Sequence, residues 1–405
     1  MKIVHFHFAD PHGVGGTESV IATLAGLQVE QGHDVRLLGI GPRFQDWRQE
    51  GLITTGVANL PTALVPGSQW PNFGSPRSWL SAAKSCWSLY KVLSAWGPEV
   101  IHVHLPVGQA LYLSLIQPVL RLRYRTQIVV TLHGPDINLS PGVEPRMVPW
   151  QRRLLQRADR VVAVSQSLRD QAYDLHPTLM RDIHVVHNGI SDEWFISRSE
   201  ASDGGKSVLY VGRISHEKGI DTLLEAWARV MKHIPDARLQ LFGSGPQQNA
   251  VSHEIAEGGL HQSATLHPAI DAAGVRELMR AATVLVLPSR TEAFPMVLLE
   301  AAAMGLPAIA SNVGGVAEII DDGATGSLVD AGDSESLALA LIQHLSISPI
   351  EQAEIGAAAR AKAENHFRAA VMAESYQRAY GVKRQSLHNA SQSENSGRLQ
   401  ISHHT

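Results

Sequence analysis

Short apolar runs alternate with amphipathic stretches along most of the chain, and this alternation predicts an α/β protein with mostly parallel sheets. In the first half, apolar runs predict strands at residues 3–8, 35–40, 100–105, 128–132, 161–165 and 184–186. Apolar residues at helical spacing predict helices at residues 17–31, 79–96 and 111–122. The stretch 42–78 is rich in Gly, Pro, Trp and Asn and shows neither period.

A polar segment separates this series from a second one of the same kind. Residues 197–206 are rich in Ser, Asp and Gly, which predicts a linker between domains. Apolar runs resume at residues 207–211, 239–242, 264–266, 283–287, 308–310 and 328–329, and helical patterns fill 350–380. We therefore expect two Rossmann-like, doubly wound domains at 1–196 and 207–364, a C-terminal helix at 365–382 and a disordered polar tail at 383–405.

Composition narrows the class of protein. The chain has 405 residues, of which 44% are hydrophobic and 18% charged, as is typical of globular proteins with a large core. The net charge of −4 argues against nucleic acid as a partner, because that partner requires a basic surface. Cys86 is the only cysteine, which excludes a disulfide within the chain and favours a reducing compartment. The first residues have the pattern of a strand, and no run of about 20 apolar residues occurs, so we expect a cytoplasmic protein without a membrane-spanning helix.

Two glutamates, Glu292 and Glu300, follow the apolar run 283–287 with seven residues between them. The local pattern places Glu292 in the loop at the C-terminal end of a strand and Glu300 about two turns into the next helix. Open α/β sheets bind ligands at that edge. Two carboxylates in one crevice accept directed hydrogen bonds from hydroxyl-rich ligands, which favours a sugar. The alternative is a pair of solvated glutamates, but the apolar neighbours of Glu300 argue against it, because an unpaired carboxylate is costly there.

Two glycine-containing loops carry candidate phosphate contacts. Arg213 and Lys218 lie in one loop after the strand 207–211, and two such cations suit a diphosphate, with solvated surface cations as the alternative. Gly15 and Gly16 open the first helix, where backbone N–H groups can meet a phosphate or a sugar, with a purely structural turn as the alternative. Glu18 stands where a dinucleotide fingerprint requires Gly or Ala, so we expect no nicotinamide or flavin cofactor.

Histidines lie on or after several first-domain strands. His133 follows the strand 128–132 and can hydrogen-bond a ligand, although most of the 20 histidines in the chain are expected to be structural. His102 and His104 share one face of a strand, which raises a metal site as an alternative, but no third ligand is evident nearby. No Asp-x-Asp pair occurs in the chain, so we expect no bound metal.

The helix expected at 79–96 combines aromatic and basic residues. Trp79, Trp87 and Tyr90 lie at helical spacing among lysines, and Arg121, Arg123 and Arg125 follow later. The pattern fits either a core-facing stripe with solvated cations or a patch that contacts anionic lipid headgroups.

Together these motifs resemble those of the retaining glycosyltransferases of the GT-B fold, family 4 (glycosyl transferases group 1). The resemblance extends from Lys2 to about Tyr380 and is most specific in the second domain. There the Arg213–Lys218 pair, the Glu-x7-Glu spacing and Gly314-Gly315 occur in the family's order. The pairs Gly15-Gly16, His133-Gly134 and Asn188-Gly189 also match.

The resemblance implies catalytic roles for four residues. Arg213 and Lys218 would hold the leaving diphosphate, Glu292 would contact the hydroxyls of the reacting sugar, and His133 would lie at the reacting centre.

It also implies a set of donor contacts. The backbone of Gly15-Gly16 would approach the donor, and Glu300 would bind the ribose hydroxyls. The backbone of Phe294, Pro295 and Met296 would meet the sugar and the phosphate. Ala293 replaces a glycine that is common in the family, and His267-Pro268 replace another near the base pocket, which leaves the donor base open between UDP, GDP and ADP.

The activity implied by the resemblance is retaining transfer of a hexose from a nucleotide-diphosphate sugar to an acceptor hydroxyl, in polysaccharide or lipid-linked glycan synthesis. The first domain would hold the acceptor and the second the donor, and the helix at 365–382 would cross back onto the first domain. No metal or other cofactor is implied, and a lipid-linked acceptor would add a peripheral contact with the inner face of the membrane. A nucleotide-sugar 2-epimerase of the same fold and a non-catalytic nucleotide-sugar-binding module are the alternatives.

Overall fold

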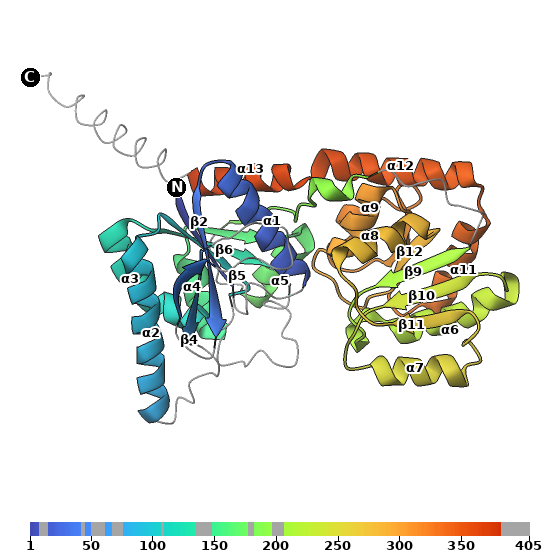
Figure 1. Ribbon diagram of the computed structural model, residues 1–405, viewed down its shortest axis with the longest axis horizontal. Helices are drawn as coiled ribbons and strands as arrows, with labels where there is room; N and C mark the ends of the chain where they lie inside the picture. The colour runs from blue at the N-terminus through green and yellow to red at the C-terminus, as the bar shows by residue number, and fades with distance from the viewer. Residues whose placement is uncertain are drawn as a thin grey trace, which may run out of the picture.

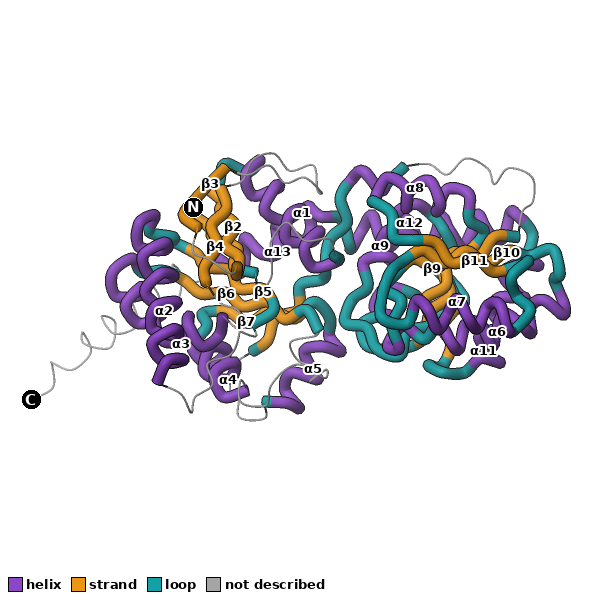
Figure 2. The backbone as a smooth tube through the Cα atoms, turned by 60° about the horizontal axis from the view of Figure 1, so that its bottom comes forward, coloured by secondary structure: helices purple, strands orange, loops and turns teal. Residues whose placement is uncertain are grey.

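The elements of the chain form two α/β domains that lie side by side, each built on one sheet (Figure 1). The computed structural model describes residues 1–7, 15–41, 45–49, 61–66, 76–106, 109–134, 148–176, 182–196 and 206–381. Both sheets are mainly parallel and both have helices on their faces (Figure 2). The expected fold class, two Rossmann-like doubly wound domains, is confirmed.

The sheet of the first domain has the strand order β3-β4-β2-β1-β5-β6-β7-β8. Neighbouring strands are parallel, except that β3 and β4 are antiparallel. Strands β5 and β6 are buried along their whole length, as expected for the centre of a parallel sheet that is covered on both faces. The strands are β1 (Lys2–Phe6), β2 (Asp34–Gly41), β3 (Gln45–Gln49), β4 (Pro61–Pro66), β5 (Val100–His104), β6 (Gln127–Leu132), β7 (Arg160–Ala163) and β8 (Ile183–Val185).

The sheet of the second domain has the order β11-β10-β9-β12-β13-β14, and all of its neighbouring strands are parallel. The chain adds β10 and β11 on one side of β9 and then returns to add β12 to β14 on the other side. Strand order therefore reverses between β9 and β12. The strands are β9 (Ser207–Val211), β10 (Arg238–Phe242), β11 (Ala264–His267), β12 (Val284–Leu287), β13 (Ala308–Ser311) and β14 (Ser327–Val329).

The helices of the first domain are α1 (Gly16–Glu30), α2 (Pro76–Trp96), α3 (Gln109–Tyr124), α4 (Val148–Arg157) and α5 (Gln166–Leu175), and the 3-10 turn η2 (Asp192–Trp194) follows them. Those of the second are α6 (Ile220–His233), α7 (Gln248–Glu257), α8 (Ala272–Ala281), α9 (Met296–Met304), α10 (Val316–Ile319) and α11 (Ser334–Ser346), and the last two helices are α12 (Pro349–His366) and α13 (Ala369–Gly381).

Local sequence explains where several helices begin. The Ser165 hydroxyl accepts a hydrogen bond from the backbone N–H of Leu168 and so caps α5. The Asp271 carboxylate caps α8 in the same way. At the start of α12, Ser348 and Glu351 form a reciprocal capping box with Pro349 at the first helical position. These side chains satisfy N–H groups that have no partner within the helix.

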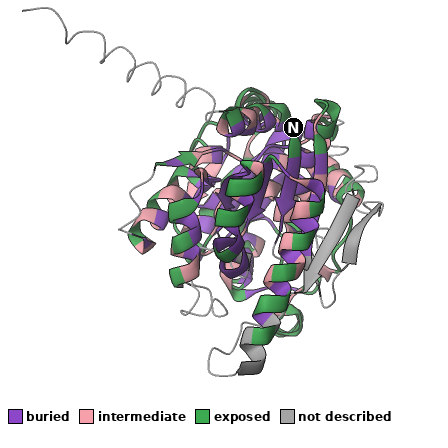
Figure 3. Cartoon of the chain, turned by 90° about the vertical axis from the view of Figure 1, so that its left-hand side faces the viewer, coloured by how far each residue is buried: buried purple, intermediate pink, exposed green. Residues whose placement is uncertain are grey.

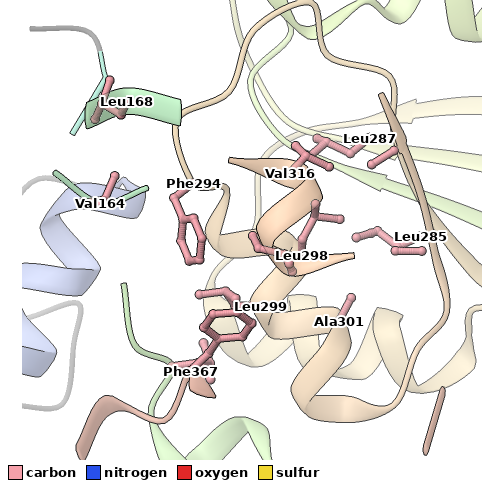
Figure 4. Close-up of a cluster of buried hydrophobic side chains, with 14 of the residues drawn as sticks. Val164, Leu168, Leu285, Leu287, Phe294, Leu298, Leu299, Ala301, Val316 and Phe367 are labelled. Carbon is pink, nitrogen blue, oxygen red and sulfur yellow. The ribbon is translucent and has the colours of Figure 1, made fainter. Parts of the chain in front are cut away.

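A continuous apolar core joins the two domains. Val164 and Leu168 of the first domain belong to the same cluster of buried residues as Phe294, Leu298 and Phe367 (Figure 4). Because these side chains are buried against one another, the apolar contact favours the arrangement in which the two domains meet.

The last helix returns to the first domain. α12 lies along the second domain, and α13 continues over the first, where it packs against α1 (Figure 1). Gly189, after β8, permits this approach, because a Cβ atom there would lie 2.6 Å from the Cα of Ala369.

Several predictions differ from the structure or lie beyond it. Strands β3 and β4 fall in the stretch 42–78 that showed no pattern, and helices α4 and α5 were not predicted. Most of the expected linker and all of the expected C-terminal tail lie outside the described residues. Within the described part of the chain, no helix is both long and apolar enough to cross a membrane.

Candidate functional site

The carboxyl ends of the two sheets face each other. A Cβ atom on Gly16, which begins the helix after β1, would lie 3.4 Å from Cγ of Met296 in the second domain. A Cβ atom on Gly134, after β6, would lie 2.6 Å from the Cβ of Ala293. Gly134 has φ +121°, a conformation that glycine adopts most readily. The two predicted glycine sites of the first domain therefore meet the segment that follows β12.

Lys218 and Glu292 form an ion pair where the strand order of the second sheet reverses. Lys218 ends a 3-10 turn (His216–Lys218) after β9, and Glu292 follows β12. The Lys218 Nζ lies 2.6 Å from Glu292 Oε1, and the Ser289 hydroxyl donates to the same oxygen at 2.7 Å. Ligands bind at such a reversal in open α/β sheets. The structure thus brings together a predicted diphosphate contact and a predicted sugar contact.

Arg213 is exposed in the same loop. The buried Tyr210 fixes the backbone of that loop by donating its hydroxyl to the Arg213 carbonyl at 2.8 Å. Burial by itself raises the pKa of the nearby Glu217, but a hydrogen bond from Ser215 and the charges of Arg213 and Lys218 bring the pKa below its usual value. Of the two cations in this loop, Lys218 is paired with Glu292, while the exposed Arg213 is available to an anionic ligand.

Gly314 and Gly315 hold the Glu292 loop in place. Gly315 donates its backbone N–H to the Ala293 carbonyl at 3.1 Å. Gly314 has φ +54°, and a Cβ atom there would lie 1.6 Å from the Glu292 carbonyl oxygen. Only glycine permits this approach, so the glycine pair predicted from the sequence packs against the backbone of Glu292 and Ala293 and holds it in place.

The three residues after Ala293 divide between the core and the start of a helix. The Phe294 side chain is buried between the domains, where its ring stacks on His187 with the centroids 4.9 Å apart. Pro295 is the N-cap of α9, and Met296 is its first residue. This segment leads into a helix N-terminus, which is a favourable place for an anion.

Glu300 lies one turn into α9, not two, because the helix begins only after Pro295. Burial raises the pKa of Glu300 to about 7, while the charge of Arg276 lowers it and that of Glu193 raises it. Arg276 comes from α8, and its Nη1 lies 3.1 Å from Glu193 Oε2 of the turn η2. The Glu300 carboxyl group is therefore protonated more readily than an ordinary glutamate, a perturbation typical of functional sites.

His133 is buried at the end of β6 in a group of histidines. Its Nε2 lies 3.1 Å from Nδ1 of His104. Burial, with a smaller contribution from His7, lowers the pKa of His133 to about 3, so the ring is neutral at pH 7.

The expectation that no third ligand lies near His102 and His104 is wrong. His5 of β1 joins them, and one ring nitrogen of each lies within 4.8 Å of the others. Three imidazoles match the ligand number of a catalytic zinc site. Both ring nitrogens of each, however, already lie within hydrogen-bond distance of a protein partner.

Sequence reasoning gave no role to Glu318, which joins the two domains. Its carboxylate accepts hydrogen bonds from the backbone N–H groups of Gln166 and Ser167, at the start of α5 in the first domain. It also lies 2.8 Å from His187 Nε2. The only feature of the sequence that could have indicated a role for Glu318 is its position in the Gly-rich segment after β13.

Two aromatic rings end neighbouring strands of the second sheet. His267, the last residue of β11, stacks on Phe242, the last residue of β10, with the centroids 4.4 Å apart and the planes 15° from parallel. The pair lies at the sheet edge where the resemblance implies the base pocket.

Comparisons with known proteins cover nearly the whole of this architecture. The family model for glycosyl transferases group 1 matches residues 192–362, and that for glycosyltransferase family 4 matches residues 14–194. The alpha-maltose-1-phosphate synthase of Mycolicibacterium smegmatis is 31% identical over 316 residues, which are 71% of this chain and 79% of that protein. The chain belongs to the group 1 glycosyltransferases.

Other known proteins are similar to this chain over greater lengths. The N-acetyl-alpha-D-glucosaminyl L-malate synthase of Bacillus anthracis is 27% identical over 91% of this chain and 94% of its own. The sucrose-phosphate synthase of Thermosynechococcus elongatus has a TM-score of 0.75 at 22% identity, over 96% of this chain and 100% of that chain. Anabaena HepE in complex with UDP has a TM-score of 0.69 at 20% identity, over 94% of this chain and 99% of that chain. These structures share the GT-B fold with the group 1 glycosyltransferase described here, as predicted.

Proposed function

We propose that the protein is a retaining glycosyltransferase that moves a hexose from a nucleotide-diphosphate sugar to an acceptor hydroxyl, in polysaccharide or lipid-linked glycan synthesis. The observation that carries the proposal is the Lys218–Glu292 pair at the reversal of the second sheet. It lies next to Ala293, which contacts Gly134 beside His133 in the first domain. HepE has been solved with UDP and with UDP-glucose, which supports a nucleotide-sugar donor.

The second domain binds the donor in this proposal. Arg213 and Lys218 neutralise the diphosphate, and the start of α9 offers backbone N–H groups to it. Glu300 accepts hydrogen bonds from the ribose hydroxyls, and Glu292 accepts them from the hexose. Ser289 already donates to Glu292, so the carboxylate keeps its orientation when Lys218 turns toward the phosphates.

Transfer then takes place on one face of the sugar. The bond between the anomeric carbon and the diphosphate oxygen breaks, and the acceptor oxygen bonds to the anomeric carbon from the same side. The departing diphosphate takes the acceptor proton, so no side chain has to act as a strong base. Arg213 and Lys218 stabilise the charge that grows on the diphosphate, which is the largest contribution that the site makes. The neutral His133 serves as a hydrogen-bond partner and adds no positive charge.

An assay of nucleoside-diphosphate release tests the proposal. With a panel of UDP-, GDP- and ADP-sugars, release should depend on an added acceptor, and the product should keep the anomeric configuration of the donor by NMR. Activity should persist in excess chelator, because two side-chain cations supply the charge. A free epimer formed without acceptor would indicate a 2-epimerase, and donor binding without turnover would indicate a binding module; either result overturns the proposal.

A second proposal concerns the acceptor. We propose that α2 and α3 dock on an anionic membrane that carries it. Trp87 and Leu122 are 66% and 89% exposed, and Leu80 and Val119 of these helices are also exposed. Figure 3 views the molecule from the side of the first domain and shows exposed residues along its helices. Arg123 of α3 lies 3.5 Å from the Tyr90 hydroxyl of α2, which joins the two faces. Exposed apolar side chains among cations favour a lipid interface.

The structure changes the choice of variants for this test. Arg121 is bound to Asp159 at 2.7 Å and to the Arg157 carbonyl, so it cannot serve as a headgroup contact and should be left intact. The wild type should sediment with phosphatidylserine-containing vesicles at low salt, and reversal of Lys84, Lys91 and Arg123 to Glu should abolish binding. Failure of the wild type to bind at low salt would contradict the proposal.

A further inference from the structure

A chain of hydrogen bonds leads from His133 deep into the first domain. His133 Nε2 lies 3.1 Å from His104 Nδ1, and His104 Nε2 lies 3.0 Å from His5 Nδ1. His5 Nε2 lies 2.8 Å from the Gln28 carbonyl oxygen Oε1. His5 and Gln28 are fully buried and His104 nearly so. In such a place every polar atom needs a partner, so the network is closely constrained.

Gln28 fixes the direction of every bond in this chain. An amide oxygen only accepts, so His5 Nε2 must carry the proton that it donates. Neutral His5 then accepts at Nδ1, which places the donated proton on His104 Nε2. By the same step His104 accepts at Nδ1, which places the proton of His133 on Nε2. The lone pair of the His133 ring therefore resides on Nδ1.

The other end of the Gln28 amide leads to the C-terminal helix. Its Nε2 donates to the Tyr380 hydroxyl at 3.2 Å, and Tyr380 lies 2.7 Å from His102 Nδ1. His102 Nε2 lies 2.7 Å from Thr131 Oγ1, which is 3.1 Å from the Tyr376 hydroxyl. Tyr376 and Tyr380 both belong to α13. The helix that returns from the second domain thus takes part in the hydrogen bonds that orient His133.

We propose that Gln28, His5 and His104 form a relay that positions His133 and fixes its Nε2–H tautomer, and that α13 completes the relay through Tyr380. The inference rests on the proposed function, since it assigns these residues to transfer through His133. All three are positioning residues, because none of them lies at the reacting centre. A tautomer fixed by the bond at the opposite ring nitrogen is a common way to tune histidine.

A metal site is the competing explanation for the clustering of these histidines. A metal at His5, His102 and His104 would need one lone pair from each ring. In the relay, His5 and His104 each use their lone pair on another imidazole, and His102 uses its own on the Tyr380 hydroxyl. Metal binding and the relay therefore exclude each other, and the metal content of the purified protein is one arm of the test.

The relay is tested by a cycle of substitutions. Gln28→Leu should lower kcat roughly tenfold, the effect of one lost hydrogen bond, with the donor KM unchanged. In a His133→Ala background it should have no further effect, because the relay acts through that ring. Gln28→Glu should restore most of the turnover, since a carboxyl oxygen still accepts from His5. Gln117→Leu is the matched control, because Gln117 is a buried glutamine of the same domain bonded only to the Arg157 carbonyl among the described contacts.

Two measurements separate failure of the relay from failure of the proposed function. Long-range 15N–1H NMR of histidine-labelled protein, with His133→Gln used for assignment, should show His133 protonated at Nε2 at pH 7 whether or not transfer is detected. An Nδ1–H tautomer, a stoichiometric metal ion that is lost in His5→Phe, or equal effects of Gln28→Leu with and without His133 would each overturn the relay.

Discussion

Lys218 and Glu292 neutralise each other while the donor is absent, and this pairing affects how substitutions at either position behave. The Glu292 side chain is only 9% exposed, so removal of Lys218 leaves a nearly buried carboxylate with Ser289 as its remaining described partner. Loss of a buried partner costs stability as well as function. Kinetic effects at this site should therefore be measured on protein whose folding has been checked.

Arg213→Ala and Lys218→Ala should each reduce turnover by roughly 10²–10³, the usual loss for one group that stabilises charge in the transition state. Lys206→Ala is the matched control: Lys206 also forms an ion pair, with Asp236, but it precedes β9 at the opposite end of the strand. Steady-state kinetics give the measurement. Near wild-type turnover in either site variant would remove the diphosphate assignment.

Glu300→Gln should raise the donor KM and change kcat little, because a ribose contact binds the ground state and the transition state alike. Because the pKa of Glu300 is raised to about 7, the donor KM should also depend on pH. The ionised carboxylate is the better acceptor, so the wild-type KM should fall as pH rises from 6 to 8, and the Gln variant should be flat. A collapsed kcat with an unchanged KM would place Glu300 at the reacting sugar instead.

The same substitution should stabilise the protein without donor. Ionised Glu300 is disfavoured in the folded state, so its penalty begins above the ordinary pKa of 4.5 and is complete only above about 7. The free energy of unfolding of Glu300→Gln relative to wild type should therefore increase between pH 5 and pH 8. Denaturant titrations at the two pH values measure this difference, and a constant difference would contradict the raised pKa.

At the scale of elements, the helix α5 depends on a carboxylate from the other domain. Glu318 accepts from the first two N–H groups of α5, so the second domain supplies an acidic group to the N-terminus of a first-domain helix. Burial by itself raises the pKa of Glu318, but hydrogen bonds from His187 and these N–H groups bring it below 4.5. Its stabilising effect is thus complete at neutral pH and is lost only as the pH falls below the ordinary pKa of 4.5 and through the lowered pKa of the folded state.

Glu318→Ala should therefore weaken the contact between the domains, with a loss on the order of 1–2 kcal/mol at pH 7. Differential hydrogen exchange at the start of α5 is the direct measurement, and kcat/KM should fall in parallel because the site is built from both domains. Glu277→Ala is the control, since the ion pair of Glu277 among the described residues is with Arg280 of its own helix. Unchanged exchange at residues 166–169 would show that Glu318 does not stabilise the contact.

Much of the fold could be predicted because parallel strands are buried and apolar, as in the runs 128–132 and 284–287. The loops after the strands could be predicted as the site because open α/β sheets bind ligands at the carboxyl ends of their strands. Helices α4 and α5 were not predicted because their sequences, VPWQRRLLQR and QSLRDQAYDL, contain few apolar residues. Such helices depend on tertiary contacts. The contact of Glu318 with His187 and that of His5 with His104 were not predicted, because these pairs are 131 and 99 residues apart and a single sequence holds no signal for such contacts.

At the scale of the whole molecule, the described part of the chain begins and ends in the first domain. α13 buries Tyr376 and Tyr380 against the first domain after the second has been completed. A protein truncated after His366 should keep the second sheet but lose cooperative unfolding of the first domain, because Gln28 and His102 would lose their Tyr380 partner. Circular dichroism melts and limited proteolysis would test this, and a first domain as resistant as that of the full chain would contradict it.

The return of α13 also sets an order of events during synthesis. Gln28 leaves the ribosome early, yet Tyr380, to which it donates, is among the last residues of the described chain. Nascent domains usually fold in order from the N-terminus. Here the later domain, whose strands end at Val329, has its whole sheet translated before the earlier domain has all of its core. Until α13 has been translated, the first domain lacks the Tyr380 and Tyr376 hydroxyls that complete the hydrogen bonds around its histidines.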